Sequence, residues 1–278
     1  MQYRAWLRTM KARALVRLWS IFGEPLWIVV SMGFPILSSL ALFLLYYSIG
    51  ATGYVGFAIL GGVMVAFWGN VLWSMASQFN WDKQEGLFEI YLTSPASISA
   101  ILIGMSVGGI IGTLPSSVIV VVMGWLLAGL LHITIPVAGS WVAVGLTFAL
   151  TLASLYAMGM TLSSLYLVYG REAESMNEVL QEPVSMLSGI YFPSYGAGSP
   201  FPVALQAVAS LIPLTIGMYA LRQTLFPSSG GGDVLVSVLP YLAELAVMAV
   251  IFLGLSILSL KALENKGRRD GTISVRIR

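Results

Sequence analysis

Four charged side chains fall within eight residues of the segment 81–104, which separates two long apolar runs: Asp82, Lys83, Glu85 and Glu89. A charge placed in the hydrocarbon core of a bilayer costs several kcal/mol, so a polar segment of this kind belongs at a membrane surface. Carboxylates at a surface pair with basic groups of the right protein and repel wrong ones. The segment therefore predicts a docking site for a soluble protein; the alternative is an ordinary polar loop.

The spacing of the apolar residues in this segment favours a short surface helix. Side chains recur at i, i+3 and i+4, at Leu87, Ile90 and Tyr91. Glu85 and Glu89 share another face of the same helix, an amphipathic pattern that suits a membrane surface. Ser94 precedes Pro95, and the residue before a proline is disfavoured in the α region, so the helix is expected to end there.

Other polar side chains fall inside apolar runs, where an ionisable residue is a functional candidate by default. Glu244 is the central one: it either lines a transport path or holds an outer cap, or it is a neutral or hydrogen-bonded carboxyl group. Glu182 is interpreted as a carboxylate at the inner boundary of the membrane, with an inner gate as the alternative. Asn70 and Gln78 are interpreted as interhelical hydrogen-bonding residues rather than substrate ligands. Arg222 is expected to extend to the outer surface.

Enzymatic chemistry is not expected of this chain. We find no carboxylate pair, metal-ligand cluster or nucleophile triad, no cysteine, and one histidine, His132, where a pH sensor is not expected. The chain also lacks the G-x-x-x-x-G-K-[ST] loop that cradles ATP phosphates. We therefore expect no cofactor, no metal and no nucleic-acid partner.

The composition indicates a polytopic membrane protein of the all-α class. Of the 278 residues, 58% are hydrophobic and only 9% are charged, whereas a soluble domain carries about a quarter charged residues. Several apolar runs reach the roughly 20 residues that a spanning helix needs. We expect a single domain over 1–278 with six spans near 26–49, 54–79, 101–131, 138–168, 183–192 and 234–260. The fifth is too short to cross unless it is extended.

The distribution of cations predicts the orientation. With both termini in the cytoplasm, thirteen of the fourteen lysine and arginine residues lie inside, in agreement with the positive-inside rule. The basic segment 1–24 is expected to form a helix at the membrane interface, and 261–278 to form a cytoplasmic tail.

The segment 193–222 is rich in proline and glycine, and it includes Pro193, Pro202 and Pro213. Irregular backbone at membrane depth must be buried in protein or line an aqueous cavity. We expect two short helices that dip into the outer leaflet and return, as a re-entrant cap over an outward opening.

Two motifs in this order resemble the permease subunits of ABC-2-type exporters. The first consists of Glu85-Gly86, Glu89, Leu92, Ser94-Pro95 and Ser97, with Leu87 where threonine is more usual. The second consists of Ser188-Gly189, Phe192-Pro193, Pro200, Pro202, Pro213-Leu214-Thr215 and Ala220-Leu221-Arg222. The six-span layout extends the resemblance over essentially the whole chain.

The resemblance implies a second permease copy or paralogue, two copies of an ABC ATPase that bind ATP and Mg, membrane lipid around the chain, and a prokaryotic cell membrane. The segment 81–99 would carry the coupling helix that docks on the ATPase, through Asp82, Glu85, Gly86, Glu89, Leu92, Ser94 and Pro95. The transport path or gate would include Asn70, Glu182, Glu244 and Phe192. The substrate is left open among drugs, lipids and glycans. The rival functions are an ion-coupled secondary transporter that uses Glu244 and a membrane assembly or insertase protein without transport.

Overall fold

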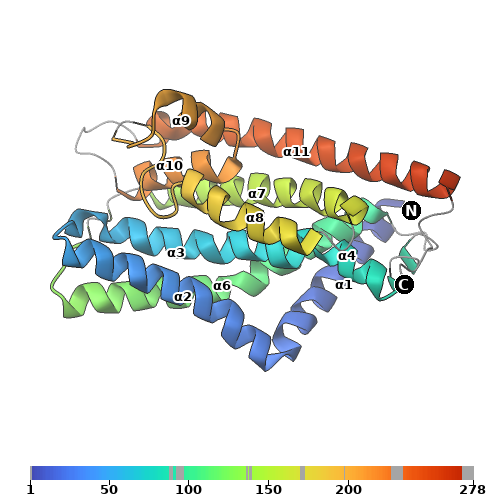
Figure 1. The fold of residues 1–278 in the computed structure, drawn as a ribbon, viewed down its shortest axis with the longest axis horizontal. Helices are drawn as coiled ribbons and strands as arrows, with labels where there is room; N and C mark the ends of the chain where they lie inside the picture. Colours follow the sequence, from blue (N-terminus) through green and yellow to red (C-terminus); the bar gives the residue numbers. More distant parts are fainter. Residues whose placement is uncertain are drawn as a thin grey trace.

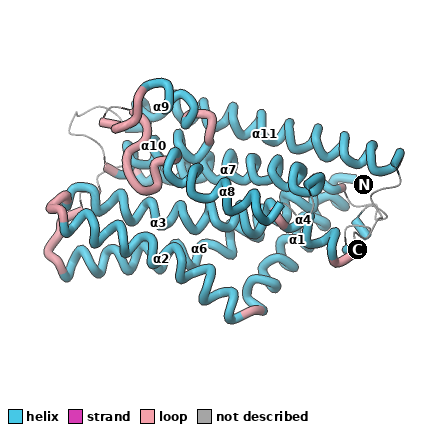
Figure 2. Tube along the Cα trace, viewed as in Figure 1, coloured by secondary structure: helices cyan, strands magenta, loops and turns pink. Residues whose placement is uncertain are grey.

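The computed structural model describes residues 2–87, 90–91, 97–135, 137, 140–169, 173–196, 198–226 and 234–270. All regular elements within these ranges are helical (Figure 2). The predicted all-α class is confirmed. The elements are α1 (Gln2–Gly23), α2 (Pro25–Ser48), η1 (Thr52–Tyr54), α3 (Val55–Gly69), η2 (Asn70–Ala76), α4 (Gln78–Gln84), α6 (Ile98–Leu130), α7 (Trp141–Tyr169), α8 (Ala173–Leu187), α9 (Val203–Ala209), α10 (Pro213–Leu225) and α11 (Val234–Asp270).

Five helical stretches of the described chain are long and apolar enough to cross a membrane, and they match five of the six expected spans. They are Ile28–Ser48, Thr52–Gln84, Ile98–Leu130, Trp141–Tyr166 and Val234–Ala262. The second of these is continuous through α3, the π-helical η2 and α4. The pair α9 and α10, bent by 104°, is the sixth candidate as a broken span or a re-entrant loop.

The region of the expected fifth span differs from the prediction. Helix α8 begins at Ala173, inside the polar stretch, and ends at Leu187, so 183–192 is not one continuous helix. Gly189 has a φ of +76°, a left-handed conformation that favours glycine and terminates helices. The chain is irregular until α9, and the two short helices that follow match the expected pair. Their place in the outer leaflet stays a prediction.

The second span forms the centre of the bundle (Figure 1). Helix α2 packs along α3, α1 and α3 pack against α6, and α11 and α10 pack against α7. The outward faces of α2, α6 and α11 expose large apolar side chains, as expected of helices that contact lipid, including Val29, Leu37, Val118, Trp125 and Val250. The start of α1 and the end of α11 lie at the same end of the bundle (Figure 1).

Candidate functional site

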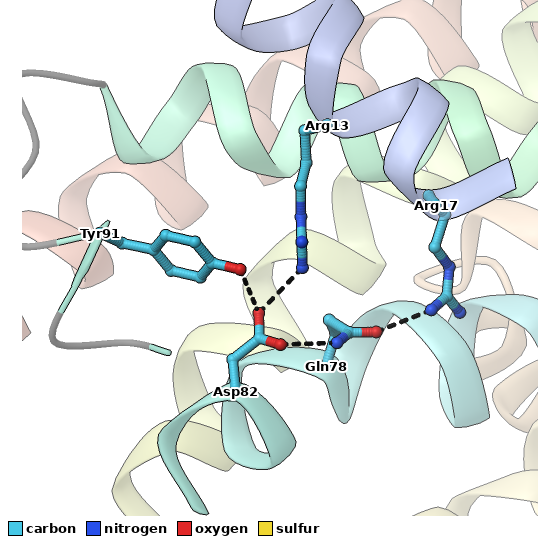
Figure 3. A network of polar contacts seen from close by, with 5 residues as sticks. All are labelled: Arg13, Arg17, Gln78, Asp82 and Tyr91. Atoms are coloured by element: carbon cyan, nitrogen blue, oxygen red, sulfur yellow. Dashed lines mark hydrogen bonds and ion pairs between the residues drawn. The ribbon is translucent and has the colours of Figure 1, made fainter. Parts of the chain in front are cut away.

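A polar cluster joins α1 to the end of the second span (Figure 3). We call it the polar joint, and it consists of Arg13, Arg17, Gln78, Asp82 and Tyr91. The Arg13 Nη2 donates to Asp82 Oδ2 at 2.9 Å, and the Tyr91 hydroxyl donates to the same oxygen at 3.0 Å. Gln78 Nε2 donates to Asp82 Oδ1 at 2.7 Å, and Arg17 Nη1 donates to Gln78 Oε1 at 2.7 Å. Both oxygens of the Asp82 carboxylate are therefore occupied within the chain.

Helical spacing explains how two segments far apart in sequence match each other. Arg13 and Arg17 lie four residues apart on α1, and Gln78 and Asp82 lie four residues apart on the second span, so each pair shares one helix face. Across the contact, Arg13 faces Asp82 and Arg17 faces Gln78. Matched pairs at this spacing were the available signal for the joint in the sequence, and Arg13 and Arg17 were not predicted as its members.

Small residues on α6 let α1 approach closely enough to form the joint. A Cβ atom on Gly104 would lie 2.5 Å from the backbone oxygen of Met10, and one on Gly108 would lie 2.8 Å from that of Ala14. Both distances are far shorter than van der Waals contact, so only glycine fits at these two positions. The backbone of α1 therefore rests directly on α6.

Arg17 and Tyr91 of the joint each keep one protonation state near neutral pH. Burial, with the nearby positive charge of Arg13, lowers the pKa of Arg17 to about 10, so Arg17 stays charged. Burial raises the pKa of Tyr91 to about 12, so its hydroxyl remains a proton donor to Asp82. The Arg13 guanidinium also lies over the Tyr91 ring, 5.4 Å from the ring centroid, a favourable cation–π arrangement.

We call 81–99 the docking segment, after its expected role. It overlaps the joint at Asp82 and Tyr91, and its exposed part begins at Glu85. Helix α4 ends at Gln84, and Gly86 takes a φ of +78°, which turns the chain away from the helix. Glu85 is exposed, and so are the apolar side chains of Leu87 and Ile90. A charged group beside exposed apolar groups suits contact with another protein. Four of the expected docking residues lie outside the described residues: Glu89, Leu92, Ser94 and Pro95.

Asp82 differs from the other expected docking residues. Its side chain is only 2% exposed, because Arg13, Gln78 and Tyr91 surround it. A buried carboxylate with three internal partners does not reach another protein. Asp82 therefore lies inside the polar joint and not on the exposed surface of the docking segment.

The amides of the second span are interhelical, as interpreted from the sequence. Asn70, the first residue of η2, accepts a hydrogen bond of 2.8 Å from the Tyr156 hydroxyl of α7. Gln78 bridges Arg17 and Asp82 within the joint. Asn70 also lines a cavity.

The predicted gate residues near α8 form a second group. Glu182 is exposed and accepts a hydrogen bond of 3.0 Å from the Tyr191 hydroxyl. Phe192 packs edge-on against Phe201, with ring centroids 5.4 Å apart. These contacts tie the end of α8 to the loop before α9.

Arg222 does not extend to the outer surface, so that expectation is wrong. It is 8% exposed, donates to the backbone oxygen of Gly189, and lies over the Phe57 ring at 4.8 Å from the centroid. The side chain turns inward because the carbonyl that follows α8 and an aromatic face offer it partners there.

Glu244 lies on α11 close to the loop before α9. It is near enough to Tyr195 and Tyr241 for electrostatic interaction, and the rings of Tyr195 and Tyr241 both pack against Tyr219 of α10. Of the prolines in this region, Pro202 precedes α9, Pro213 begins α10 and Pro193 lies in the irregular segment. These positions bring Glu244 to the expected cap and away from the polar joint.

Comparison with known proteins bears on the whole arrangement. The family model described as ABC-2 type transporter matches residues 7–226, a range that includes both motifs and the polar joint. No curated protein matches the chain. The family is one of membrane permeases without a nucleotide-binding domain, which agrees with the expectation that this chain is not an enzyme and binds no ATP itself. The chain belongs to the ABC-2 type transporter family.

Proposed function

We propose that this chain is the permease subunit of an ATP-driven exporter and moves a drug, a lipid, a glycan or a similar molecule outward. Membership of the ABC-2 family supports the pairing with an ABC ATPase. The observation that carries the coupling role is the polar joint, which anchors the exposed start of the docking segment to α1 and the second span at once.

The joint gives the chain a way to transmit force. The ATPase binds the segment that begins at Glu85 and Gly86 and continues through Glu89 to Ser94 and Pro95. A displacement of this segment pulls on Asp82, whose two carboxylate oxygens carry it to α1 and along the central span. Buried, charge-assisted hydrogen bonds are stronger than neutral ones and suit this purpose.

The complete exporter in this proposal contains two permeases and two ATPase subunits, with both permease termini in the cytoplasm of a prokaryotic cell. The second permease is a copy of this chain or a paralogue. Glu182 and Phe192 stand beside the path at the end of α8. The outer cap is the segment 193–222, which includes α9 and α10. Arg222 of α10 binds the backbone at Gly189 just before this segment, and Tyr195 within it lies near Glu244 of α11.

The test is co-purification of the chain from its native membrane, followed by an ATPase assay. We expect an ATPase subunit with a phosphate-binding loop to be recovered, and the double charge reversal Glu85→Lys with Glu89→Lys to release it. The matched control is Glu178→Lys, an exposed reversal on α8, which should leave the complex intact. A chain recovered alone, with no ATP turnover, would refute the proposal; transport driven by a proton gradient through Glu244 would then be the function to test.

A further inference from the structure

A cavity of about 350 Å³ lies next to the corner between α1 and α2 and is lined by residues on both sides of that corner. Its walls come from the end of α1, from α2, from the junction of α3 and η2, from α6 and from α8. Small-molecule sites in proteins begin at roughly this size and are mostly apolar, with a few placed polar groups. The cavity therefore has the dimensions of a binding site.

The lining on the side of α1 and α2 is apolar except for Ser31, whose hydroxyl donates to the backbone oxygen of Ile28. None of the described residues that line the cavity is charged. Phe22 and Phe34 stand on this side with several aliphatic residues. Burying an ion without a countercharge is costly, so a charged head group does not suit the cavity.

The opposite wall carries five polar side chains besides the indole of Trp73. Two of them, Thr113 and Ser116, donate their hydroxyls to backbone oxygens of α6. The other three are Asn70, Ser74 and Gln181. Within the described chain, no hydrogen bond uses the Asn70 amide NH2, the Ser74 hydroxyl or the Gln181 amide NH2. The orientation of Gln181 is fixed by Trp73, whose indole N–H can only donate and donates to Gln181 Oε1. The NH2 of Gln181 is consequently free to donate to another molecule.

The local backbone places two of these donors on one side of the second span. Asn70 and Ser74 both belong to η2, a π-helix that interrupts the central span. Such segments are rare and frequently mark functional sites. The Tyr156 hydroxyl occupies the oxygen of the Asn70 amide at 2.8 Å.

We propose that this cavity binds a neutral amphiphile, with an apolar chain or ring system against Phe22 and Phe34 and an uncharged acceptor oxygen, such as an ester or ether, at Asn70, Ser74 and Gln181. The molecule is either cargo or a resident membrane lipid. Its role as cargo rests on the proposed function, whereas binding itself needs no ATPase. Binding of the amphiphile can therefore be confirmed even if the exporter function is refuted, and the exporter function can be confirmed even if binding is refuted.

The experiment uses the purified full chain in nanodiscs with a monoacylglycerol that carries a photoreactive diazirine in its acyl chain. Irradiation is expected to label peptides from the lining of the cavity, and unlabelled monoolein is expected to compete. Each of the substitutions Asn70→Leu, Ser74→Ala and Gln181→Leu should weaken competition about two- to tenfold, the value of one neutral hydrogen bond. Ser237→Ala, which removes an exposed hydroxyl on α11, is the matched control and should change nothing.

The chemistry of the head group is tested with charged analogues of the same chain length. Oleate and oleylammonium should compete at least about tenfold less well than monoolein, because the lining offers no countercharge. Ser74→Ala is the smallest change and keeps the test meaningful if a leucine variant fails to fold, as checked by its melting temperature. Labelling confined to the lipid-facing sides of α2, α6 and α11, labelling that the three substitutions leave unchanged, or equal competition by the ions would overturn the proposal.

The source of the molecule is decided in reconstituted vesicles that contain the ATPase. ATP-dependent movement of the monoacylglycerol to the other leaflet identifies the occupant as cargo, and bound probe without movement identifies it as a resident lipid. Both results support the site. A complex without ATP turnover would instead count against the proposed function while leaving the binding measurement intact.

Discussion

Asp82 holds three partners from α1, from its own helix and from the docking segment, and its charge balances one of the two nearby arginines. Forming a buried ion pair adds little net stability, because both charges lose their hydration. Removing one partner is nevertheless strongly destabilising, because the other charge stays buried without a countercharge. That asymmetry makes Asp82 the residue whose removal tells most about the joint.

The substitution Asp82→Asn should lower the free energy of unfolding by about 3–5 kcal/mol, because Arg13 then stays buried without a countercharge. The measurement is equilibrium unfolding in detergent micelles, followed by tryptophan fluorescence. Glu85→Gln removes a neighbouring but exposed charge and should change stability by no more than about 0.5 kcal/mol.

The double variant Arg13→Gln with Asp82→Asn should cost clearly less than the sum of the two single variants, since both ends of the pair lose their charge together. Additive costs would mean that the two side chains do not stabilise each other. Asp82 would then need another explanation for its burial.

At the scale of elements, two glycines of α6 decide where α1 lies. Gly104 and Gly108 face backbone oxygens of α1, which cannot move aside as a flexible side chain can. The backbones of these two helices therefore pack directly against each other. This contact determines where along the second span Arg13 and Arg17 make their hydrogen bonds.

The substitution Gly104→Ala should push α1 away from α6 and destabilise the chain by about 1–3 kcal/mol, the usual cost of overpacking. The control is Gly129→Ala on the same helix, where an added Cβ meets nothing within 4 Å. Thermal unfolding in micelles distinguishes the two, and equal melting temperatures would contradict the packing argument.

The turn at Gly86 also requires glycine, because its backbone is in the left-handed region. Its φ of +78° costs an L-residue about 1–2 kcal/mol, so Gly86→Ala should redirect the docking segment and weaken ATPase recovery. Gly69→Ala, where a Cβ meets nothing within 4 Å, is the control and should leave recovery unchanged. Full recovery with Gly86→Ala would mean that the turn does not position the segment.

The sequence was informative wherever one long apolar run makes one helix. Spans around α2, α3, α6, α7 and α11 agree with the apolar runs because length and hydropathy alone determine them. The region after α7 was harder, because α8 mixes polar and apolar residues and ends at a left-handed glycine. The polar joint and the inward turn of Arg222 depend on contacts between distant segments, which hydropathy does not encode.

The whole molecule presents apolar side chains on α2, α6 and α11, and the start of α1 and the end of α11 lie at one end of the bundle (Figure 1). The turn between α2 and α3 lies at the opposite end (Figure 1). The distribution of cations predicts the orientation, with α1 and the end of α11 on the cytoplasmic side.

This orientation is testable because the chain has no cysteine. A single cysteine at Thr52, in the turn before α3, should react with a membrane-impermeant maleimide in intact cells. A single cysteine at Gln84, at the end of α4, should react only after permeabilisation. Both positions are exposed, so the reverse pattern would show the opposite orientation.

Helix α1 carries both the polar joint and part of the cavity wall. Arg13 and Ile21 are separated by about 12 Å of helix, so a tilt of about 10° at the joint displaces the wall by about 2 Å. A movement of α1 thus changes both the polar joint and the cavity. Thermodynamic linkage between binding at these two sites is reciprocal. Whatever factor a bound amphiphile applies to the affinity for the ATPase, the ATPase applies to the affinity for the amphiphile.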